Sequence, residues 1–437
     1  MLSVDFIRNN QEKVLEAAKN KNREVDIDKI IKLDHQKLEL IHKIQKLREK
    51  RNQLAKQPHS AQDKQGFVRG KKIKEELKGL EQELKGVEPE LIRLLYLVPN
   101  IPFAEVPIGK DETENKVIRK WGVPKKFQFD PKDHVKLGEL LDVIDIKTAS
   151  KVVATRFAYI KNELAVLEYA LVLYVFQLLT NPEKVKEIAD SVKVGYHNKT
   201  FIPVVPPVMI NPDTYRKMAR LDETQEIEKY HLQRDNLYLI GSAEHTLGAM
   251  HMDQTFFEQN LPLRYIGFST SFRREAGSYG KDTKGILRVH QFDKIEMESF
   301  TIPEDSKIEQ DFFVAIQEYL MKSLEIPYQV VMICTGDMGT PDARQLDIEA
   351  WLPGQNKYRE THTSDLMTDY QARRLNTKVK LKSGKTEFVH MNDATAFAIG
   401  RTLIAILENY QQKDGSVLVP KVLQALTGFD KIMPKKT

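Results

Sequence analysis

The N-terminal quarter of the chain carries a heptad pattern, which limits both the kind of structure it can form and how that structure packs. Apolar residues alternate at spacings of four and three, at Ile73, Leu77, Leu80, Leu84, Val87, Leu91 and Leu94. A looser apolar series precedes it, interrupted by Lys37 and Arg51, at Leu33, Leu40, Ile44, Leu47 and Leu54. Heptad spacing gives a helix one apolar stripe that is buried against a second helix. The sequence therefore predicts two paired helices.

The segment between these two patterns predicts a reversal of the chain. Residues 57–70 include Pro58, Gly66 and several small polar residues, which are typical of a connection. The helices should fold back as an antiparallel coiled-coil arm, with a first helix from Leu33 to Gln57 about 37 Å long at about 1.5 Å per residue. Pro89 lies inside the second pattern and is expected to bend or locally unwind that helix.

The predicted arm is basic. Residues 31–98 hold 16 lysines and arginines against 10 aspartates and glutamates, a net charge of +6, whereas the whole chain has a net charge of +5. A basic coiled coil suits contact with a phosphate backbone. Solvated coiled-coil flanks are also commonly rich in lysine without any partner. The residues alone leave both interpretations open.

The remainder of the chain has a different organisation. Residues 97–122 contain three prolines and no helical period, which predicts an extended linker. We therefore expect an N-terminal domain over residues 1–104 and a second domain over 105–437. Short apolar strand patterns and helices mix in the second part, which predicts an α+β fold with a largely antiparallel sheet flanked by helices. Neither a GxGxxG nor a GxxxxGK[ST] nucleotide-binding motif is present.

Composition excludes several classes of protein. The longest apolar run, Leu164 to Leu179, is short for a membrane span and contains Glu168, so we expect a buried helix and no membrane association. The N-terminal segment lacks a signal-peptide pattern, and a cytoplasmic location is expected. Cys334 is the single cysteine, which excludes an internal disulfide and a thiolate zinc cluster. No zinc is therefore expected.

The segment from Phe272 to Glu298 combines the residue types of a nucleotide site. Alternation by two would place Arg273 and Glu275 on one face of a first strand, and Arg288, Phe292 and Glu296 on one face of a second. Arginine suits phosphate, an aromatic ring suits a base, and a carboxylate suits an amino group. A solvated hairpin with cross-strand ion pairs is the alternative interpretation.

Four segments together resemble a known family. Residues 272–298 are similar to motif 2 of class II aminoacyl-tRNA synthetases in its seryl-tRNA synthetase form. Residues 200–210 resemble motif 1, residues 238–251 the serine-binding segment, and residues 400–411 motif 3. The resemblance implies a homodimeric enzyme that activates L-serine with ATP to seryl-adenylate and transfers serine to tRNA(Ser). It also implies that the N-terminal arm recognises that tRNA.

The resemblance implies how ATP is held. By motif position, Arg273 contacts the α-phosphate and the substrate carboxylate, and Glu275 the adenine amino group. Phe292 stacks on adenine, and Arg288 and Arg401 grip the outer phosphates, Arg401 also packing on adenine from the opposite side. Adenylate formation is phosphoryl-group chemistry that relies on positioning and charge stabilisation, which suits arginines.

The remaining roles follow from the same motifs. Glu360 and Thr363 match residues that bind Mg²⁺ and ATP phosphate, so Mg²⁺ with ATP is the expected cofactor. The residues expected to bind serine are Ser242, Glu244, Arg273, Glu296 and Thr395. The expected catalytic residues are Arg273, Arg401 and Glu296. The residues expected to contact tRNA are Lys64, Arg69, Lys71, Lys72, Ser278 and Tyr279.

Several positions depart from the family pattern. Asp393 stands where asparagine is usual, eight residues before the motif 3 arginine. The usual Ser-Ser-Cys-Ser-Asn-Phe segment is Thr-His-Thr-Ser-Asp-Leu over residues 361–366, and Arg274 replaces a usually smaller or uncharged residue. Two alternatives therefore accompany the main hypothesis: a paralogue with altered amino-acid specificity or a carrier-protein acceptor, and a non-catalytic tRNA-binding regulator.

Overall fold

The computed structural model describes residues 1–56, 64–222, 225–276 and 284–435. The chain divides into two compact units, Met1–Ile101 and Pro102–Thr437. The side chains of residues 64–66 lie outside the description.

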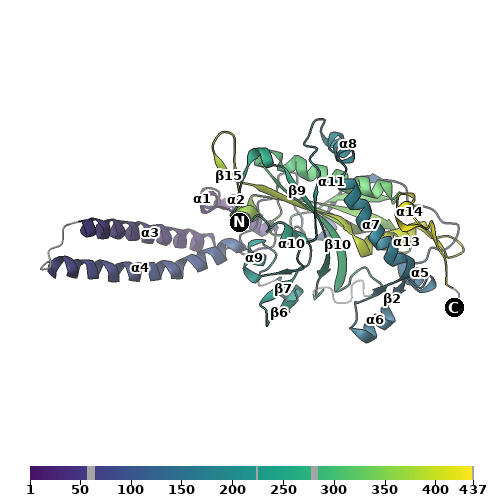
Figure 1. Cartoon of the computed structure of the whole chain (residues 1–437), viewed down its shortest axis with the longest axis horizontal. Coiled ribbons are helices and arrows are strands. Elements are labelled where there is room, and N and C mark those ends of the chain that lie inside the picture. Colours follow the sequence, from purple (N-terminus) through teal and green to yellow (C-terminus); the bar gives the residue numbers. More distant parts are fainter. Residues whose placement is uncertain (57–63, 223–224, 277–283, 436–437) are drawn as a thin grey trace. The chain divides into compact units, whose positions relative to one another are not determined.

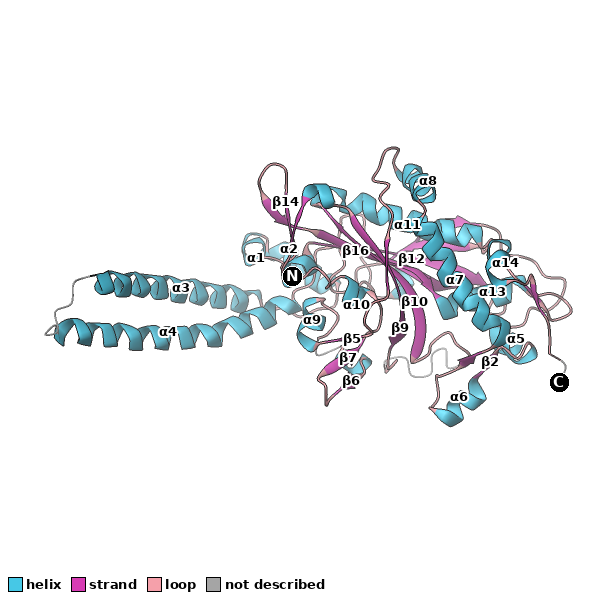
Figure 2. Ribbon diagram, in the orientation of Figure 1, coloured by secondary structure: helices cyan, strands magenta, loops and turns pink. Residues whose placement is uncertain are grey.

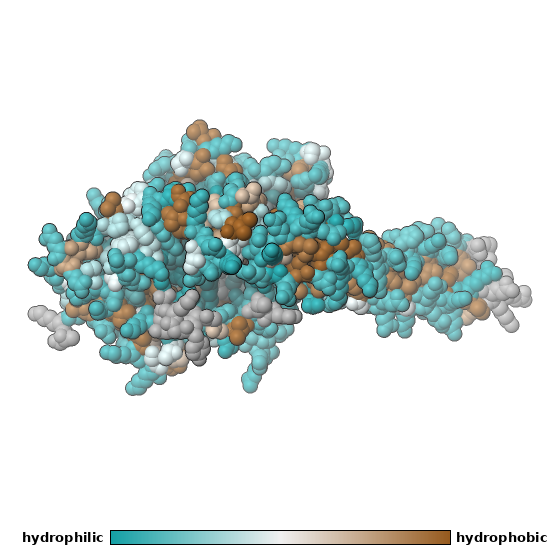
Figure 3. All heavy atoms as spheres, turned by 180° about the vertical axis from the view of Figure 1, so that it is seen from behind, coloured by the Kyte–Doolittle hydropathy of each residue, from teal (hydrophilic) through white to brown (hydrophobic). Residues whose placement is uncertain are grey.

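The regular elements in the described part of the first unit are all helices. It consists of α1 (Val4–Asn9), α2 (Gln11–Asn20), α3 (Ile27–Lys56) and α4 (Lys64–Leu97). The two long helices run antiparallel, as the heptad pattern predicts (Figure 1). Ile44, Leu47 and Leu77 form the buried centre of their seam. Figure 3 shows apolar side chains along this arm with hydrophilic side chains beside them.

The boundaries of the arm helices differ from the prediction in two ways. Helix α3 begins at Ile27, six residues before the expected Leu33, and is 30 residues long. Helix α4 begins at Lys64, so the second half of the expected connection over residues 57–70 is helical. Helix α4 continues through Pro89 without the expected unwinding, and the expected bend stays a prediction. Ion pairs from α3 to Glu88 and Glu90 lie on either side of this proline, and tertiary contacts of this kind override weak helix-breaking signals.

The second unit is built on one eight-stranded sheet. Its strand order is β1-β11-β12-β13-β16-β10-β9-β4. Neighbouring strands are antiparallel except β4 and β9, which are parallel. The strands are β1 (Lys116–Trp121), β4 (Ile202–Val204), β9 (Leu263–Phe272), β10 (Gln291–Thr301), β11 (Tyr328–Met332), β12 (Arg344–Leu352), β13 (Lys357–Thr368) and β16 (His390–Ala398). The predicted α+β fold is thereby confirmed.

Helices cover the sheet and enclose the main core (Figure 2). The larger ones are α7 (Asn162–Thr180), α8 (Pro182–Val192), α11 (Ser306–Ser323) and α13 (Ile399–Tyr410). The smaller helices are α5 (His134–Leu140), α6 (Ile146–Val152), α9 (Pro212–Lys217), α10 (Glu244–Leu247), α12 (Tyr370–Leu375) and α14 (Lys421–Thr427). The small strands are β2 (Ile144–Asp145), β3 (Tyr159–Ile160), β5 (Met209–Ile210), β6 (His231–Leu232), β7 (Leu237–Leu239), β8 (Thr255–Phe257), β14 (Lys378–Lys380), β15 (Thr386–Phe388), β17 (Val417–Leu418) and β18 (Lys431–Ile432).

Helix α7 is apolar on two faces. Its inner face, including Leu164, Leu167 and Leu171, lies in the main core. Val166, Tyr169 and Leu173 are exposed on the outer side. Within the described residues, α7 is the one helix long and apolar enough to cross a membrane, but only by length and composition. Its burial in the core of the second unit fits the predicted buried helix.

A side-chain cap defines the start of one helix beside the sheet. Helix α5 begins at His134, and its N-cap is Asp133, whose carboxylate accepts from the Lys136 amide at 2.9 Å. A capping carboxylate must lie directly before the first helical turn, and Asp133 satisfies that geometry.

A buried ion pair joins the sheet to α11. Arg264 of β9 and Glu309 of α11 form two hydrogen bonds of 2.7 Å, and both side chains are 0% exposed. Arg264 also donates to the backbone oxygens of His197 and Lys199, and its guanidinium lies 4.3 Å from the centre of the Phe312 ring. The guanidinium and the carboxylate both have hydrogen-bond partners. The pair therefore holds β9 against α11 and against the segment that precedes β4.

We expect Glu309→Ala to lower the free energy of unfolding of the second unit by about 3–5 kcal/mol, because it leaves a buried guanidinium unpaired. Both tryptophans, Trp121 and Trp351, lie in this unit, so their fluorescence during urea unfolding at fixed protein concentration reports the change. The control is Glu187→Ala, which removes the partner of Lys184 on α8; these side chains are 56% and 45% exposed. A loss no larger than in that control would contradict the structural role of the buried pair.

Candidate functional site

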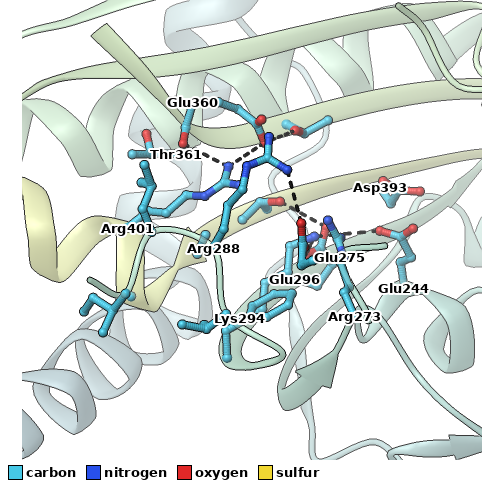
Figure 4. A pocket seen from close by; sticks show the side chains of 18 of the residues that line it. Glu244, Arg273, Glu275, Arg288, Lys294, Glu296, Glu360, Thr361, Asp393 and Arg401 are labelled. Carbon is cyan, nitrogen blue, oxygen red and sulfur yellow. Dashed lines mark hydrogen bonds and ion pairs between the residues drawn. The ribbon is translucent and has the colours of Figure 1, made fainter. Parts of the chain in front are cut away.

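A polar cavity lies on strands β10, β13 and β16 of the sheet, beside the segment that joins β9 to β10 and the start of α13. Its walls carry the charged residues Arg220, Glu244, Arg273, Glu275, Arg288, Lys294, Glu296, Glu360, Asp365, Asp393 and Arg401. Phe292, Thr363 and Thr395 also line it. Figure 4 shows side chains from several separate segments converging on this space. The cavity therefore collects residues that are far apart in the sequence.

Alternation along β10 explains one wall. Ile295 and Met297 point into the main core, whereas Phe292, Lys294 and Glu296 line the cavity. This is the two-residue period of a strand buried on both faces. Lys294 was not among the predicted site residues, although the same alternation identifies it.

The predicted strand positions of three motif 2 residues are wrong. Strand β9 ends at Phe272 and β10 begins at Gln291, so Arg273, Glu275 and Arg288 lie in the connecting segment. Glu275 has a φ of 51°, which lies in the left-handed region. The segment is held near the sheet by a hydrogen bond from the Arg273 amide to the His290 oxygen, 3.0 Å long. All three side chains nevertheless reach the cavity.

One end of the cavity is dominated by arginines. Arg401 of α13 lies 2.9 Å from the Glu360 carboxylate, and Arg288 lies 3.1 Å from that of Glu275. The Arg273 guanidinium lies 5.3 Å from the centre of the Phe292 ring. Burial disfavours the charge of Glu360, but Arg401 and Arg273 outweigh that effect and lower its pKa. This end presents an aromatic face surrounded by groups that bind phosphate and amino groups.

Oxygen ligands suitable for a divalent cation lie beside these arginines. The Thr363 hydroxyl is 3.5 Å from the Glu360 carboxylate. Asp347 of β12 is the cross-strand partner of Thr363. Burial, and secondly the charge of Glu360, raise the pKa of Asp347 well above its usual range. Two carboxylates and a hydroxyl fit the preference of Mg²⁺ for oxygen ligands. Asp347 was missed because its contribution depends on strand register.

The opposite end of the cavity is dominated by carboxylates. Oxygen atoms of Glu244, Glu296 and Asp393 all lie within 4.8 Å of one another. Lys294 is 2.7 Å from Glu296, and the Thr395 hydroxyl donates to Glu296 at 3.4 Å. The Ser242 hydroxyl donates to Glu244 at 3.2 Å. The predicted residues Ser242, Glu244, Glu296 and Thr395 are therefore brought together.

The protonation states at this end are set by burial and by two cations. Burial opposes ionisation of Glu244, but Arg220, 3.0 Å away, holds its pKa well below the usual range. Burial raises the pKa of Glu296 to about 7, against the attraction of Lys294. Burial and the charge of Glu244 raise the pKa of Asp393 well above its usual range, although Arg220 opposes this shift. The end can receive a cation and hydrogen-bond a small polar group.

Not all predicted tRNA contacts fall within the described structure. Ser278 and Tyr279 lie outside the described residues, as does the side chain of Lys64. Arg69, Lys71 and Lys72 are exposed on α4. Their candidate role stays a prediction.

Comparisons with known proteins agree with this arrangement. Residues 227–410 match the model of the tRNA synthetase class II core domain (G, H, P, S and T), and residues 1–102 match that of the seryl-tRNA synthetase N-terminal domain. The chain is 39% identical to serine–tRNA ligase of Thermodesulfovibrio yellowstonii, over 99% of this chain and 100% of the relative. It is 40% identical to serine–tRNA ligase of Dictyoglomus turgidum, over 100% of both chains.

Two solved structures are similar over the whole chain. Seryl-tRNA synthetase from Pyrococcus horikoshii, complexed with ATP, gives a TM-score of 0.85 at 35% identity, covering 100% of both chains. Cytoplasmic serine–tRNA ligase from Naegleria fowleri, in complex with AMP, gives 0.82 at 30% identity, covering 100% of this chain and 99% of the other. The fold and site define a class II aminoacyl-tRNA synthetase. Within that class, the chain belongs to the seryl-tRNA synthetase family.

Proposed function

We propose that this protein is an ATP-dependent ligase that activates L-serine to seryl-adenylate and transfers serine to tRNA(Ser). The observation that carries the proposal is the joining of an arginine-rich end and a carboxylate-rich end in one cavity. A cavity with this polarity suits an anionic nucleotide beside a substrate that carries an ammonium group. The reaction is inferred from family membership. The two ends of the cavity support one subsite for each reactant.

The arginine-rich end takes ATP. Phe292 stacks on adenine, and Glu275 accepts from the adenine amino group when Arg288 turns from Glu275 to phosphate. Arg401 likewise exchanges Glu360 for phosphate oxygens and packs on the base. Arg273 bridges the α-phosphate and the serine carboxylate. A carboxylate oxygen of serine attacks the α-phosphorus, and pyrophosphate leaves. Forked guanidinium contacts stabilise the charge that develops in this step.

The carboxylate-rich end takes serine. Glu244 and Glu296 receive the ammonium group, Ser242 supports Glu244, and Thr395 contacts the substrate hydroxyl. In the second step, a ribose hydroxyl of the tRNA attacks the acyl carbon, and AMP leaves. Positioning of both reactants accounts for catalysis, since this chemistry needs no covalent intermediate on the protein.

Mg²⁺ accompanies ATP in this proposal. Glu360, Thr363 and Asp347 would hold the ion through oxygen atoms. When bound, the ion neutralises phosphate charge and polarises the phosphoryl oxygens. Binding would also relieve the repulsion between the carboxylates of Glu360 and Asp347.

The arm and α7 suit the remaining partners. Arg69, Lys71 and Lys72 of α4 are exposed, which supports contact with the tRNA backbone. Val166, Tyr169 and Leu173 leave an exposed apolar strip on α7, which supports a homodimer formed by a second copy of the chain. The proposed activity serves translation, and we place it in the cytoplasm.

The first test is amino-acid-dependent ATP–pyrophosphate exchange. We expect exchange with serine and a preference over alanine of roughly 10⁴-fold, because the alanine complex leaves buried hydrogen-bonding groups unpaired. Thr395→Val should lower kcat/KM for serine by roughly 10- to 100-fold. Each factor of ten corresponds to about 1.4 kcal/mol of lost transition-state stabilisation. Thr301→Val, which changes a buried threonine elsewhere on β10, is the matched control. Stronger exchange with another amino acid would contradict the serine assignment.

The pH dependence of serine binding tests Glu296. Its pKa is raised to about 7, so the carboxyl is mostly neutral below that pH and ionised above it. We expect KM for serine to fall as the pH rises from 6 to 8, approaching tenfold over the whole range, because the ionised form pairs with ammonium. KM for ATP should stay nearly constant. Glu296→Gln should flatten the serine profile, and an unchanged slope in that variant would exclude Glu296 as its source.

Salt dependence of tRNA binding tests the arm. Replacing Arg69, Lys71 and Lys72 by glutamine in one variant should weaken tRNA(Ser) binding. The magnitude of the slope of log association constant against log salt concentration should fall by about 2–3. Pyrophosphate exchange, which needs no tRNA, should be unchanged. Neutralising the exposed Lys380, Lys382 and Lys413 of the second unit is the control. Equal effects on tRNA binding in both triple variants would contradict a specific arm contact.

A further inference from the structure

A single arginine faces three carboxylates beneath the proposed serine subsite. Arg220 Nε lies 3.0 Å from Glu244. Its terminal nitrogen lies 3.4 Å from Asp365 and 3.3 Å from Asp393. The Arg220 side chain is 15% exposed, and those of the three acids are 9% exposed or less. We call these four residues the Arg220 cluster.

The backbone places Arg220 there through the end of α9. Ala219 has a φ of 57°, and the Arg220 amide donates to the Tyr215 oxygen at 3.3 Å. A left-handed residue followed by this six-to-one hydrogen bond is a Schellman-type helix end. The turn directs the Arg220 side chain back over α10 and the sheet. Arg220 is therefore held from both ends, by its backbone and by its ion pairs.

The two aspartates of the cluster can be ionised together only beside a cation. Asp365 of β13 and Asp393 of β16 are directly paired across neighbouring antiparallel strands. Like charges in that position destabilise a sheet, and a buried charge without a partner is costly. Both residues are departures from the motif resemblance described above, and in the structure they meet on one guanidinium.

The cluster also changes the charge that a substrate meets. Glu244, Glu296, Asp365 and Asp393 line this end of the cavity together with Arg220 and Lys294. Arg220 and Lys294 are the two cations at this end, and removal of Arg220 would leave one cation facing the four carboxyl groups. A subsite of higher negative charge favours a ligand with a second ammonium group over one with a neutral hydroxyl.

We propose that Arg220 is a specificity-determining positioning residue. It fixes Glu244 for the substrate ammonium and pairs with Asp365 and Asp393, so that the subsite selects the neutral side chain of serine. In its absence the preference for serine falls relative to an analogue in which a second amino group replaces the hydroxyl. L-2,3-Diaminopropionate, which has the size of serine, is that analogue. The inference rests on the proposed function of the cavity.

The test compares serine with L-2,3-diaminopropionate in pyrophosphate exchange by the full-length protein. Arg220→Gln should raise KM for serine at least tenfold and leave KM for ATP within twofold. It should also lower the ratio of kcat/KM for serine to that for diaminopropionate at least tenfold. Adding Asp393→Asn should restore most of this ratio, because it removes one unpaired carboxylate. Arg119→Gln, which breaks an arginine–glutamate pair outside the cavity, is the control.

Arg220→Lys keeps the charge but lacks the fork that reaches three acids. It should lower the same ratio by a smaller factor, and it carries the test if Arg220→Gln does not fold. A ratio unchanged within twofold in the folded variants would overturn the inference while leaving the proposed function intact. Absence of serine-dependent exchange in the unmodified protein would instead contradict the proposed function, and the inference with it.

Discussion

Charge balance inside the cavity is the constraint on which the rest of the site depends. Four carboxylates converge at one end, and Arg220 and Lys294 are the cations that face them. Buried carboxylates this close cannot all be ionised without counter-charges. Glu244 is held ionised by Arg220, whereas burial and neighbouring charge favour the neutral form of Asp393. A neutral carboxyl offers one donor and one acceptor, as an asparagine amide does.

The sheet makes this charge balance possible because it fixes the register of the acids. Asp365 and Asp393 face each other across β13 and β16, and Glu296 lies opposite Thr395 across β10 and β16. Below the sheet, Gln317 of α11 donates to the backbone oxygens of Thr363 and Thr395 at 2.8 and 2.9 Å. The helix thus holds two strands of the site through buried hydrogen bonds, and the Arg264–Glu309 pair holds β9 against the same helix.

The sequence predicted those features that follow from local residue patterns and from motifs. Heptad spacing predicted the paired helices of the arm, and the motifs named most of the charged residues that line the cavity of the second unit. It missed features that depend on tertiary placement. Arg220 follows a short helix and has no sequence signal for its three acidic partners, and Asp347 joins Glu360 only through strand register. Strand lengths around Arg273 and Arg288 were also wrong, because alternation alone cannot locate where pairing stops.

Asp393 illustrates the same limit in energetic terms. In the sequence, an aspartate in place of asparagine indicates an altered substrate. In the structure, its carboxylate lies 3.3 Å from Arg220, so its effect depends on a residue more than 170 positions away in the chain. The significance of a buried charge is set by its neighbours, which a single sequence does not place.

In the proposed function, one cavity holds adenylate and serine together and recognises the serine hydroxyl. Calorimetric binding of a non-hydrolysable seryl-adenylate analogue, with a sulfamoyl group in place of the phosphate, tests it most directly. We predict one site per chain and binding at least about 100-fold tighter than that of the matching alanyl analogue, because the alanyl group leaves buried polar groups unpaired. Equal affinity for the two analogues, or no binding of either, would contradict the account.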